Sequence, residues 1–561
     1  MTLPETPFVD ALLAHHATAR PDAVAVHFPT SKGGRGKTPG WTPRTFGELD
    51  READAYAHGF TQAGLVAGDR VLLALKPSAE FYPVVFGLMR ARLVPVFIDP
   101  GMGPKNALRC IEQISPKGLL AIPAAHAVRT FRPGPFKSVQ VAITAGSRWW
   151  WGGLTLTQCR KPSPQRFVSP PAAPDDDAVL VFTSGSTGPA KAVSLTHRCM
   201  SARVSRIRDL FTLDEGTTIL ETLLVYTILE ISMGLTVVVP PMDLAKPATV
   251  DPRDVVATVR AFSPTIGSAS PVVWERTVRH CQDHSVRLDA VKMMLTTAAP
   301  IPVSLHARLA DVFPKSTELF TPYGATEAMP IARIGTHEVL FDTGEKTSRG
   351  AGTCVGALDG AIDLRIMRVI DEPIPVWSDA LALPHGEIGE IVVAGDGVSR
   401  AYRNHDKGNA EAKMSDGGVT LHRMGDLGYL DPQGRLWFCG RKSHRVDTVD
   451  GLLPSVCVQG LFDPHPGVRR TALVGVGPSA AAIPVLAVEL EPGVIWSAEL
   501  EAGLRERAVG TPYQGVVKAF LHHPGFPTDT RHNSKIRNEE VATWAAARLG
   551  SAEISVASSQ K

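Results

Sequence analysis

The chain has 561 residues, of which 44% are hydrophobic and 20% charged, so it is long enough to form two or more packed units. Its 58 lysines and arginines nearly balance 56 aspartates and glutamates. The resulting net charge of +2 gives no electrostatic reason to expect nucleic acid or an anionic membrane surface as a partner.

Seven cysteines are scattered along the chain, and none is spaced as Cys-x-x-Cys. This odd, unpaired set argues against a disulfide framework and a zinc knuckle, and it favours a reducing cytoplasm. Residues 1–26 lack the basic start and continuous apolar stretch of a signal peptide. No run approaches the ~18 apolar residues that cross a bilayer, so the protein is not expected to be transmembrane.

The first predicted elements form an α/β unit. Residues 45–64 and 78–92 have the apolar periodicity of amphipathic helices. The short apolar runs at 69–75 and 94–99 flank the second helix and are predicted to be strands. An α/β layer near the N-terminus is therefore expected.

A longer alternation follows between residues 178 and 324. Short apolar runs alternate with four segments of helical periodicity, at 196–211, 252–262, 271–284 and 302–312. Strands that alternate with helices predict a parallel sheet with right-handed crossovers. We expect this sheet to begin with the strand "AVLVF" at 178–182.

The pattern changes after Pro384, where short alternating strands predict an antiparallel region. The sequence "DPQG" at 431–434 has Pro and Gly where a type I hairpin turn requires them. Past Arg441, strand and helix patterns predict a compact α+β unit. We therefore expect one domain at 1–441 and a smaller one at 442–561.

A glycine-rich stretch, "VLVFTSGSTGPAKAVSLTH" at 179–197, follows an apolar run. Glycines let backbone N–H groups converge on an anion, while Ser and Thr hydroxyls and a Lys add donors, so the stretch suits a triphosphate. It is not a Walker loop, because Lys191 lies between Ala190 and Ala192. A flexible linker is the alternative, but the expected position between a buried strand and a helix disfavours it.

The same stretch resembles the signature T-S-G-S-T-G-x-x-K of the acyl-adenylate-forming superfamily, which includes acyl-CoA synthetases, luciferases and peptide-synthetase adenylation domains. Three further stretches resemble that family in the same order: "TPYGATEAMP" at 321–330, "HRMGDLGYLDPQGRLWFCGRK" at 422–442 and "FPTDTRHNSKIRNE" at 526–539. The resemblance implies a large α/β N-terminal domain of stacked lobes with a small β-barrel-like part. It also implies a smaller, mobile α+β C-terminal domain that carries a catalytic lysine.

The resemblance also implies the ATP site. Thr183, Ser184, Gly185, Ser186, Thr187, Gly188 and Lys191 would hold the β- and γ-phosphates. Thr326 would touch the α-phosphate, and Glu327 would carry Mg²⁺, which prefers oxygen ligands. Tyr323, next to Gly324, would stack on adenine. Asp426 would accept both ribose hydroxyls, and Arg441 would donate to the same ribose.

Lys535 resembles the C-terminal lysine of the family, which bridges the substrate carboxylate and the α-phosphate. It would reach the site only if the small domain closes over the large one about a hinge at 442–444. Two departures concern the second half-reaction. Gln459 replaces a glutamate of many relatives, and Ser443 replaces the Asp or Lys often found at the hinge.

Finer wording resembles the bacterial olefin-biosynthesis branch, whose members are β-lactone synthetases. The stretches are "TPYGATEAMPIA", "RGAGTCVG", "IDPGMG", "FCGRKSHRV" and "PTDTRHNSKI". Coenzyme A ligases usually have Gly directly before the lysine, whereas Ser534 precedes it here. A 2-alkyl-3-hydroxy fatty acid carries its own nucleophile, so its adenylate can close a β-lactone and release AMP without a thiol.

The acyl chains are expected in a tunnel beside the apolar segment 221–233 and the stretch "TTAAP", with Ala298 and Ala299 as substrate-binding residues. Two alternatives stay open: a fatty acyl-CoA synthetase or acyl-AMP ligase, and a non-catalytic nucleotide-binding scaffold. The cofactors implied are ATP and Mg²⁺. The family further implies a complex with other olefin-biosynthesis enzymes. The aromatic cluster "WWW" at 149–151 is interpreted as packing of the second lobe. The alternative is an exposed cluster that contacts a partner or an acyl chain.

Overall fold

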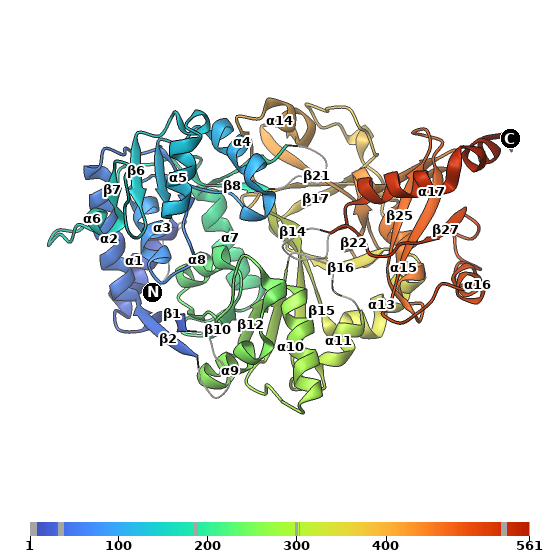
Figure 1. Cartoon of the computed structure of the whole chain (residues 1–561), viewed down its shortest axis with the longest axis horizontal. Helices are drawn as coiled ribbons and strands as arrows, with labels where there is room; N and C mark the ends of the chain where they lie inside the picture. Colours follow the sequence, from blue (N-terminus) through green and yellow to red (C-terminus); the bar gives the residue numbers. More distant parts are fainter. Residues whose placement is uncertain are drawn as a thin grey trace.

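The computed structural model describes residues 8–31, 39–183, 189–297, 301, 303–528 and 536–559. Its strands form two large sheets and two small ones. In Figure 1 the first large sheet (blue) lies at the left, the second (green and yellow) in the centre, and the C-terminal unit (red) at the right. None of the helices in these described ranges is both long and apolar enough to cross a bilayer.

The first sheet has eight strands in the order β19-β9-β8-β4-β3-β5-β6-β7. The strands are β3 (Arg70–Ala74), β4 (Val94–Phe97), β5 (Gly118–Ala121), β6 (Val141–Thr144), β7 (Leu154–Thr155), β8 (Asp177–Thr183), β9 (Lys191–Thr196) and β19 (Tyr402–Arg403). The helices of this part of the chain are α2 (Phe46–Gln62), α3 (Phe81–Arg90), α4 (Pro104–Ile114), α5 (Pro123–Phe131) and α6 (Leu156–Cys159). The two helices and two strands predicted near the N-terminus are thus confirmed.

Helix α2 begins where its sequence dictates. Thr45 caps it by accepting from the backbone N–H of Glu48, and the Glu48 carboxylate accepts from the N–H of Thr45. This reciprocal pair satisfies two donors that a helix start leaves free. The buried face of α2 then packs on α3, so the first sheet has a firm helical layer.

Two expectations about the glycine-rich stretch are wrong. The apolar strand before it, β8, lies parallel to β4 in the first sheet and does not open the second. A strand also follows the stretch before any helix, because β9 pairs antiparallel with β8 in the register Thr183↔Lys191. Five of the six β9 residues are buried, and apolar residues alternate there with Ser and Thr, so they fill a strand between β8 and β19.

The second sheet contains fourteen strands, thirteen of them in the order β17-β18-β21-β22-β16-β15-β14-β13-β12-β10-β11-β1-β2. Its parallel part comprises β10 (Thr218–Glu221), β11 (Thr236–Val238), β12 (Ile266–Ala269), β13 (Met293–Thr296) and β14 (Glu318–Ala325), and β11 is also parallel to β1 (Val24–Ser31). The hairpin partner of β1 is β2 (Gly40–Thr45). The associated helices are α1 (Val9–Ala19), α7 (His197–Leu210), α8 (Leu224–Ser232), α9 (Pro252–Phe262), α10 (Pro271–Asp283) and α11 (Val303–Leu309). The predicted parallel sheet is confirmed from β10 onward.

The antiparallel part of the second sheet follows β14. It comprises β15 (Ala328–Gly335), β16 (Thr353–Leu358), β17 (Asp363–Met367), β18 (Gly389–Ala394), β20 (Lys413–Asp416), β21 (Val419–Leu430) and β22 (Arg435–Arg441), with the short helices α12 (Thr336–Glu338), α13 (Gly344–Ser348) and α14 (Asp406–Ala412). The predicted hairpin turn joins β21 to β22, where the N–H of Gly434 donates to the carbonyl of Asp431 at 2.9 Å. It brings Asp426 opposite Arg441.

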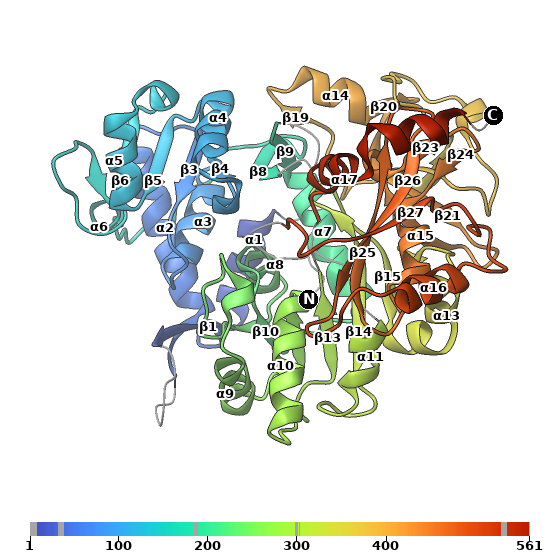
Figure 2. The ribbon, with the colours of Figure 1, turned by 45° about the vertical axis from the view of Figure 1, so that its right-hand side comes forward.

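The C-terminal unit follows a short turn at Lys442–His444. Its elements are β23 (Val446–Thr448), β24 (Gly451–Leu453), α15 (Ser455–Phe462), β25 (Val468–Val476), β26 (Ile483–Leu490), α16 (Ala498–Arg507), β27 (Ala519–His522) and α17 (Asn538–Ser559). Figure 2 shows α17 and the β25-β26-β27 sheet stacked on each other. This unit has an apolar core of its own around Leu461, Phe462 and Leu486.

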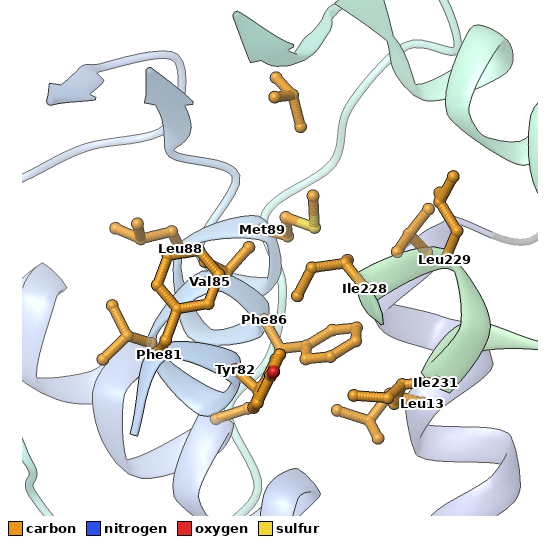
Figure 3. Packing of buried hydrophobic residues seen from close by; sticks show 14 of the residues in the cluster. Leu13, Phe81, Tyr82, Val85, Phe86, Leu88, Met89, Ile228, Leu229 and Ile231 are labelled. Carbon is orange, nitrogen blue, oxygen red and sulfur yellow. The ribbon is translucent and has the colours of Figure 1, made fainter. Parts of the chain in front are cut away.

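The largest apolar core lies between the two large sheets. Figure 3 shows α3 and α8 contributing to it side by side, with Tyr82 and Phe86 close to Ile231. These residues come from parts of the chain about 150 positions apart, as Tyr82 and Ile231 show. This core fixes the two sheets relative to each other beside the candidate site.

Candidate active site

One cavity of about 3530 Å³ is bordered by the first sheet, the second sheet and the C-terminal unit. Thr183 at the end of β8, Tyr323 on β14 and Asp426 on β21 all line it. The carboxyl ends of parallel strands are where α/β sheets bind ligands, and β10, β12, β13 and β14 end at this cavity or directly before residues that line it.

Lys191 lies at the start of β9, opposite Thr183. Its Nζ is 5.0 Å from the ring centroid of Tyr402 and 3.9 Å from Oε2 of Glu411. The Lys191 side chain is only 24% exposed and lines the cavity. The ammonium group is thus held at the cavity wall, where an anionic ligand can replace the weak contact with Glu411.

Tyr323, Asp426 and Arg441 form a connected group. The Tyr323 hydroxyl donates to Oδ2 of Asp426 at 2.6 Å, and Nη1 of Arg441 is 2.9 Å from Oδ1. Burial raises the pKa of the Asp426 carboxyl, an effect that Arg441 and the Tyr323 hydrogen bond oppose. Three residues from separate strands thereby hold one carboxyl group in place at the cavity wall.

Thr326 and Glu327 form the tight connection between β14 and β15. Arg203 of α7 donates to the carbonyl of Thr326 at 2.8 Å, and the Tyr402 hydroxyl donates to Oε1 of Glu327 at 2.8 Å. The N–H of Ser399 also donates to the Glu327 carbonyl at 2.6 Å. Both residues line the cavity, so a hydroxyl and a carboxylate are presented there on a braced turn.

One side of the cavity is apolar and is built by α3 and α8. Phe81, Val85 and Met89 are spaced four residues apart on α3, so they share one face, and all three line the cavity. Ile228 and Leu229 of α8 line it from the other helix, and Figure 3 shows both on α8, across from α3. This apolar wall matches the expected position of a tunnel beside 221–233.

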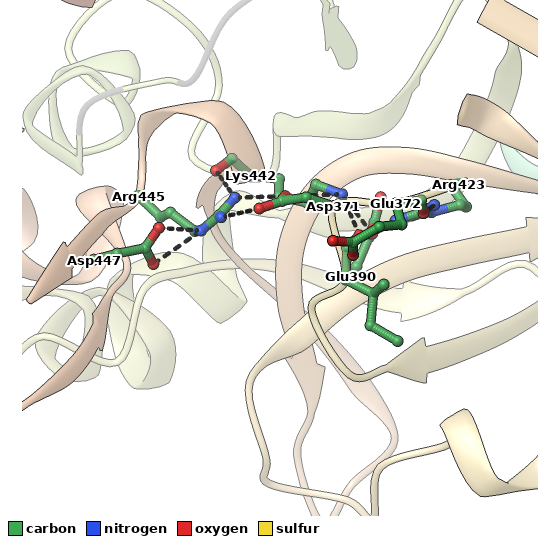
Figure 4. Close-up of polar contacts among 8 residues, drawn as sticks. Asp371, Glu372, Glu390, Arg423, Lys442, Arg445 and Asp447 are labelled. Atoms are coloured by element: carbon green, nitrogen blue, oxygen red, sulfur yellow. Dashed lines mark hydrogen bonds and ion pairs between the residues drawn. The ribbon is translucent and has the colours of Figure 1, made fainter. Parts of the chain in front are cut away.

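A network of charged groups surrounds the turn at Lys442–His444 (Figure 4). Lys442 donates to the carbonyl of Ile370 at 2.8 Å and to Oε2 of Glu390 at 3.1 Å. Arg445 pairs with Asp371 at 2.6 Å. The segment that leads into the C-terminal unit is therefore tied to the β17–β18 region by several ionic contacts.

Comparison with known proteins identifies the family of this chain. Residues 13–403 match the family of AMP-binding enzymes. The chain belongs to this family. It is similar to an olefin beta-lactone synthetase from Xanthomonas campestris, at 38% identity over 546 residues that cover 96% of this chain and 97% of the relative. An olefin beta-lactone synthetase from Stenotrophomonas maltophilia is 37% identical over 96% of this chain and 98% of the relative.

The fold of this AMP-binding enzyme also resembles solved structures. O-succinylbenzoate coenzyme A synthetase from Bacillus subtilis, in complex with ATP and magnesium ion, matches with a TM-score of 0.73 at 18% identity, over 94% of this chain and 98% of that one. The fold class that the sequence motifs predicted is therefore confirmed.

The structure brings Thr183, Lys191, Tyr323, Gly324, Thr326, Glu327, Asp426 and Arg441 to one cavity. The other predicted site residues, Ser184, Gly185, Ser186, Thr187, Gly188, Ala298, Ala299 and Lys535, lie outside the described residues. Residues on either side of them, including Thr183, Thr297 and Ile536, line the cavity of this AMP-binding enzyme.

Sequence reasoning missed three residues beside Glu327. Tyr402 bonds its carboxylate, Arg203 bonds the carbonyl before it, and Lys413 donates to the Ser399 carbonyl. Burial lowers the pKa of Lys413 to about 7, although Glu327 acts in the opposite direction. Their only sequence signal is polarity within buried elements, because each is distant from Glu327 along the chain.

Proposed function

We propose that this AMP-binding enzyme is an ATP-dependent β-lactone synthetase that acts on 2-alkyl-3-hydroxy fatty acids in long-chain olefin biosynthesis. The observation that carries the proposal is the 38% identity to an olefin beta-lactone synthetase over 96% of the chain. The polar side and the apolar side of the cavity support it, because the reaction needs a nucleotide and two long acyl chains in one site.

The first half-reaction joins the carboxylate to the α-phosphate of ATP and releases pyrophosphate. Thr183 to Gly188 and Lys191 neutralise the β- and γ-phosphates, Thr326 contacts the α-phosphate, Tyr323 stacks on adenine, and Asp426 with Arg441 binds the ribose. Catalysis of this step is positioning plus charge neutralisation, and strand ends provide rigid positions for both.

Glu327 would hold Mg²⁺. Its carboxylate lines the cavity, and its neighbours offer oxygen donors in the Thr326 hydroxyl and the ATP phosphates, which is the donor set that Mg²⁺ prefers. When bound, the ion would neutralise phosphate charge. Tyr402 orients the same carboxylate through its 2.8 Å hydrogen bond.

Residues 442–561 would act as the mobile domain that delivers Lys535. Arg537, Asn538 and Glu539, which follow Lys535 closely, line the cavity. An ammonium group there would bridge the attacking carboxylate and the α-phosphate. The turn at Lys442–His444 would be the hinge, and the contacts of Lys442 and Arg445 in Figure 4 would fix one of its orientations.

The second half-reaction is intramolecular. The 3-hydroxyl oxygen attacks the acyl carbon, its O–H bond breaks, and the bond between the acyl carbon and the phosphate oxygen breaks as AMP leaves with the electron pair. Holding the hydroxyl close to the carbonyl accelerates ring closure. The apolar wall formed by α3 and α8 keeps water from the adenylate.

A direct experiment tests this function. The purified protein is incubated with Mg-ATP and a synthetic 2-alkyl-3-hydroxy fatty acid without coenzyme A, and the product is identified by NMR at low temperature. A β-lactone with AMP is expected. Turnover only after addition of coenzyme A would identify an acyl-CoA synthetase, and ATP binding without pyrophosphate release would identify a non-catalytic scaffold.

The proposed setting is a reducing cytoplasm, since all seven cysteines are free and buried. Association with other olefin-biosynthesis enzymes is proposed as well. Trp149 and Trp150 are 54% and 64% exposed, whereas Trp151 is buried and donates to Thr144, so the first two are available to a partner and only the third is packing. Loss of co-purification with the preceding pathway enzyme in a W149A/W150A variant would check this.

A further inference from the structure

Two buried glutamates lie beside the acyl side of the cavity. Glu221 ends β10, and Glu230 lies on α8, with exposed fractions of only 1% and 5%. The two carboxyl groups are close enough to share a proton, and Oε2 of each has no other hydrogen-bond partner in the described part of the chain. Within the described ranges, no Lys, Arg or His forms an ion pair with either residue, so this buried acidic pair has no cationic partner.

The two carboxyl groups have different surroundings. Oε1 of Glu221 accepts from the N–H groups of Thr222 and Leu223, each at 2.6 Å, and Ser268 bonds the same carboxylate. Glu230 lines the cavity, and Oε2 of its carboxyl group has no hydrogen-bond partner among the described residues. Glu221 is thus stabilised as the ionised partner, while Glu230 carries the shared proton and faces the cavity.

Burial raises the pKa of Glu221 to about 7, and burial together with the Glu221 charge raises the pKa of Glu230 well above its usual range. The pair therefore holds one proton near neutral pH. Two nearby groups, Tyr82 of α3 and Tyr226 of α8, stay neutral because burial raises their pKa values. Burying two carboxyl groups without a cation costs stability. Groups of this kind are found mainly at functional sites, so the pair is a candidate for binding a ligand.

The cavity beside the pair contains another unused polar group. Ser270 follows β12, two residues after Ser268, which is the register partner of Glu221. Its side chain is fully buried and lines the cavity, yet its Oγ has no hydrogen-bond partner in the described part of the chain. A buried hydroxyl without a partner indicates a polar ligand atom at this point of an otherwise apolar wall.

Helix α8 links the pair to the nucleotide side. Tyr226 and Glu230 are four residues apart, so they share one face of the helix, about one turn from each other. The Tyr226 hydroxyl lies 3.8 Å from Sδ of Met329, three residues after Thr326. The pair therefore lies on the same helix face as a tyrosine that reaches the β14–β15 region, where Thr326 is proposed to contact the α-phosphate.

We propose that the Glu221–Glu230 pair binds the 3-hydroxyl group of the acid and accepts its proton as the lactone closes. The inference rests on the proposed function. The hydroxyl proton passes to Glu230 while the shared proton moves to Glu221, so the charge of the pair changes from −1 to 0. The freed oxygen forms the bond to the acyl carbon, and AMP leaves with the electron pair of the anhydride bond. Ser270 would donate a hydrogen bond to the same oxygen.

The test separates the two half-reactions in the full-length enzyme. In Glu230→Gln, pyrophosphate release is expected to stay within about threefold of wild type, while lactone formation falls about 100-fold or more and acyl-AMP accumulates, as removal of a general base predicts. Glu230→Asp should recover part of the rate. The matched control is Glu275→Gln, a glutamate at the cavity rim that pairs with Arg308 at 2.8 Å; it should change neither step.

A second readout uses the 3-deoxy analogue of the acid. Wild type should adenylate the hydroxy acid with a lower KM than the deoxy acid, and both Glu230→Gln and Glu221→Gln should lose this difference. Lactone formation at the wild-type rate in Glu230→Gln overturns the inference. So does an equal loss of both half-reactions in both variants, which marks a structural role. A wild-type enzyme that forms acyl-AMP but no lactone instead rejects the proposed function, and the KM comparison still tests hydroxyl binding.

Discussion

The side of the cavity proposed for the nucleotide and the side proposed for the acyl chains, here called the nucleotide side and the acyl side, are built in different ways. On the nucleotide side, Tyr323, Asp426 and Arg441 lie on β14, β21 and β22 and are joined by contacts of 2.6 and 2.9 Å. On the acyl side, α3 and α8 present apolar side chains, and the Glu221–Glu230 pair is a polar exception among them.

The difference follows from what each ligand requires. Phosphates and ribose need fixed donors and acceptors, so particular residue types must occur at particular spacings. Alkyl chains need only volume and apolar surface, which many sequences can supply. The nucleotide side is therefore expected to determine whether adenylation occurs, and the acyl side to determine what becomes of the adenylate. The variants below test that division.

The largest effect is expected from Lys535→Ala. Loss of the ammonium group proposed to bridge carboxylate and α-phosphate should lower pyrophosphate release by about 10²- to 10³-fold, the usual cost of removing one charge-stabilising group. The fold and ATP binding should be kept. Pyrophosphate release, measured with a coupled assay, and ATP binding, measured by calorimetry, give the two readouts.

Lys518→Ala is the matched control for this variant. Lys518 also belongs to the C-terminal unit, but it is exposed, and its Nζ donates to the Gly515 carbonyl at 3.0 Å. Its pyrophosphate release should equal that of wild type. Normal release from Lys535→Ala would remove the lysine from adenylation and leave the nucleotide side without its expected catalytic group.

Asp426→Ala is expected to have the next largest effect. The variant removes the carboxylate proposed for the ribose and leaves Arg441 without its partner, so the KM for ATP should rise about 10- to 100-fold.

Tyr323→Phe keeps the aromatic ring and loses only the hydrogen bond to Asp426, so the KM for ATP should rise about fivefold. Equal effects of the two variants would contradict separate roles for ring and carboxylate.

The extent of sequence prediction follows the same division. Helices α2 and α3 were predicted because their apolar periodicity is long, and the β21–β22 hairpin because Pro432 and Gly434 occupy fixed turn positions. The strand β9 was missed, since six residues directly before a helix give no separate periodicity. Pairing between β8 and β4 depends on tertiary contacts, which no local pattern records.

The same reasoning applies to the site. The residues proposed for the nucleotide were predicted from contiguous motifs, and the structure gathers the described ones at one cavity. Tyr402 and Lys413 were missed because they meet Glu327 only through folding. Glu221, at the end of β10, and Glu230, on the short apolar helix α8, were missed because a glutamate in either place is expected to be solvated until its burial is known.

On the acyl side, Glu221→Gln should change how stability depends on pH. The native carboxyl has a pKa of about 7, above the 4.5 of an exposed glutamate, so the native state binds more protons than the unfolded state between these values. The contribution to stability is complete below pH 4.5 and is lost as the pH rises through 7, by up to about 1.4 kcal/mol per pH unit. Glu221→Gln cannot ionise. Its melting temperature relative to wild type should therefore rise between pH 5 and pH 8, and a constant difference would show that burial does not raise the pKa of the Glu221 carboxyl.

The smallest effect is expected at the proposed hinge, the turn at Lys442–His444. The orientation described here brings residues 536–540 to the cavity, so it favours adenylation, and the Arg445–Asp371 contact of 2.6 Å helps to hold it. Asp371 is 60% exposed, and exposed ion pairs contribute only about 0–1 kcal/mol. Asp371→Asn should therefore slow pyrophosphate release by about two- to fivefold and leave lactone closure from preformed acyl-AMP unchanged.

Raised salt should slow wild type more than the variant, because screening weakens the same contact. Asp363→Asn, which breaks the exposed pair with Arg365 at 2.7 Å away from the hinge, serves as the control. Equal slowing of both half-reactions by Asp371→Asn would show that this contact maintains the fold and does not select a hinge orientation.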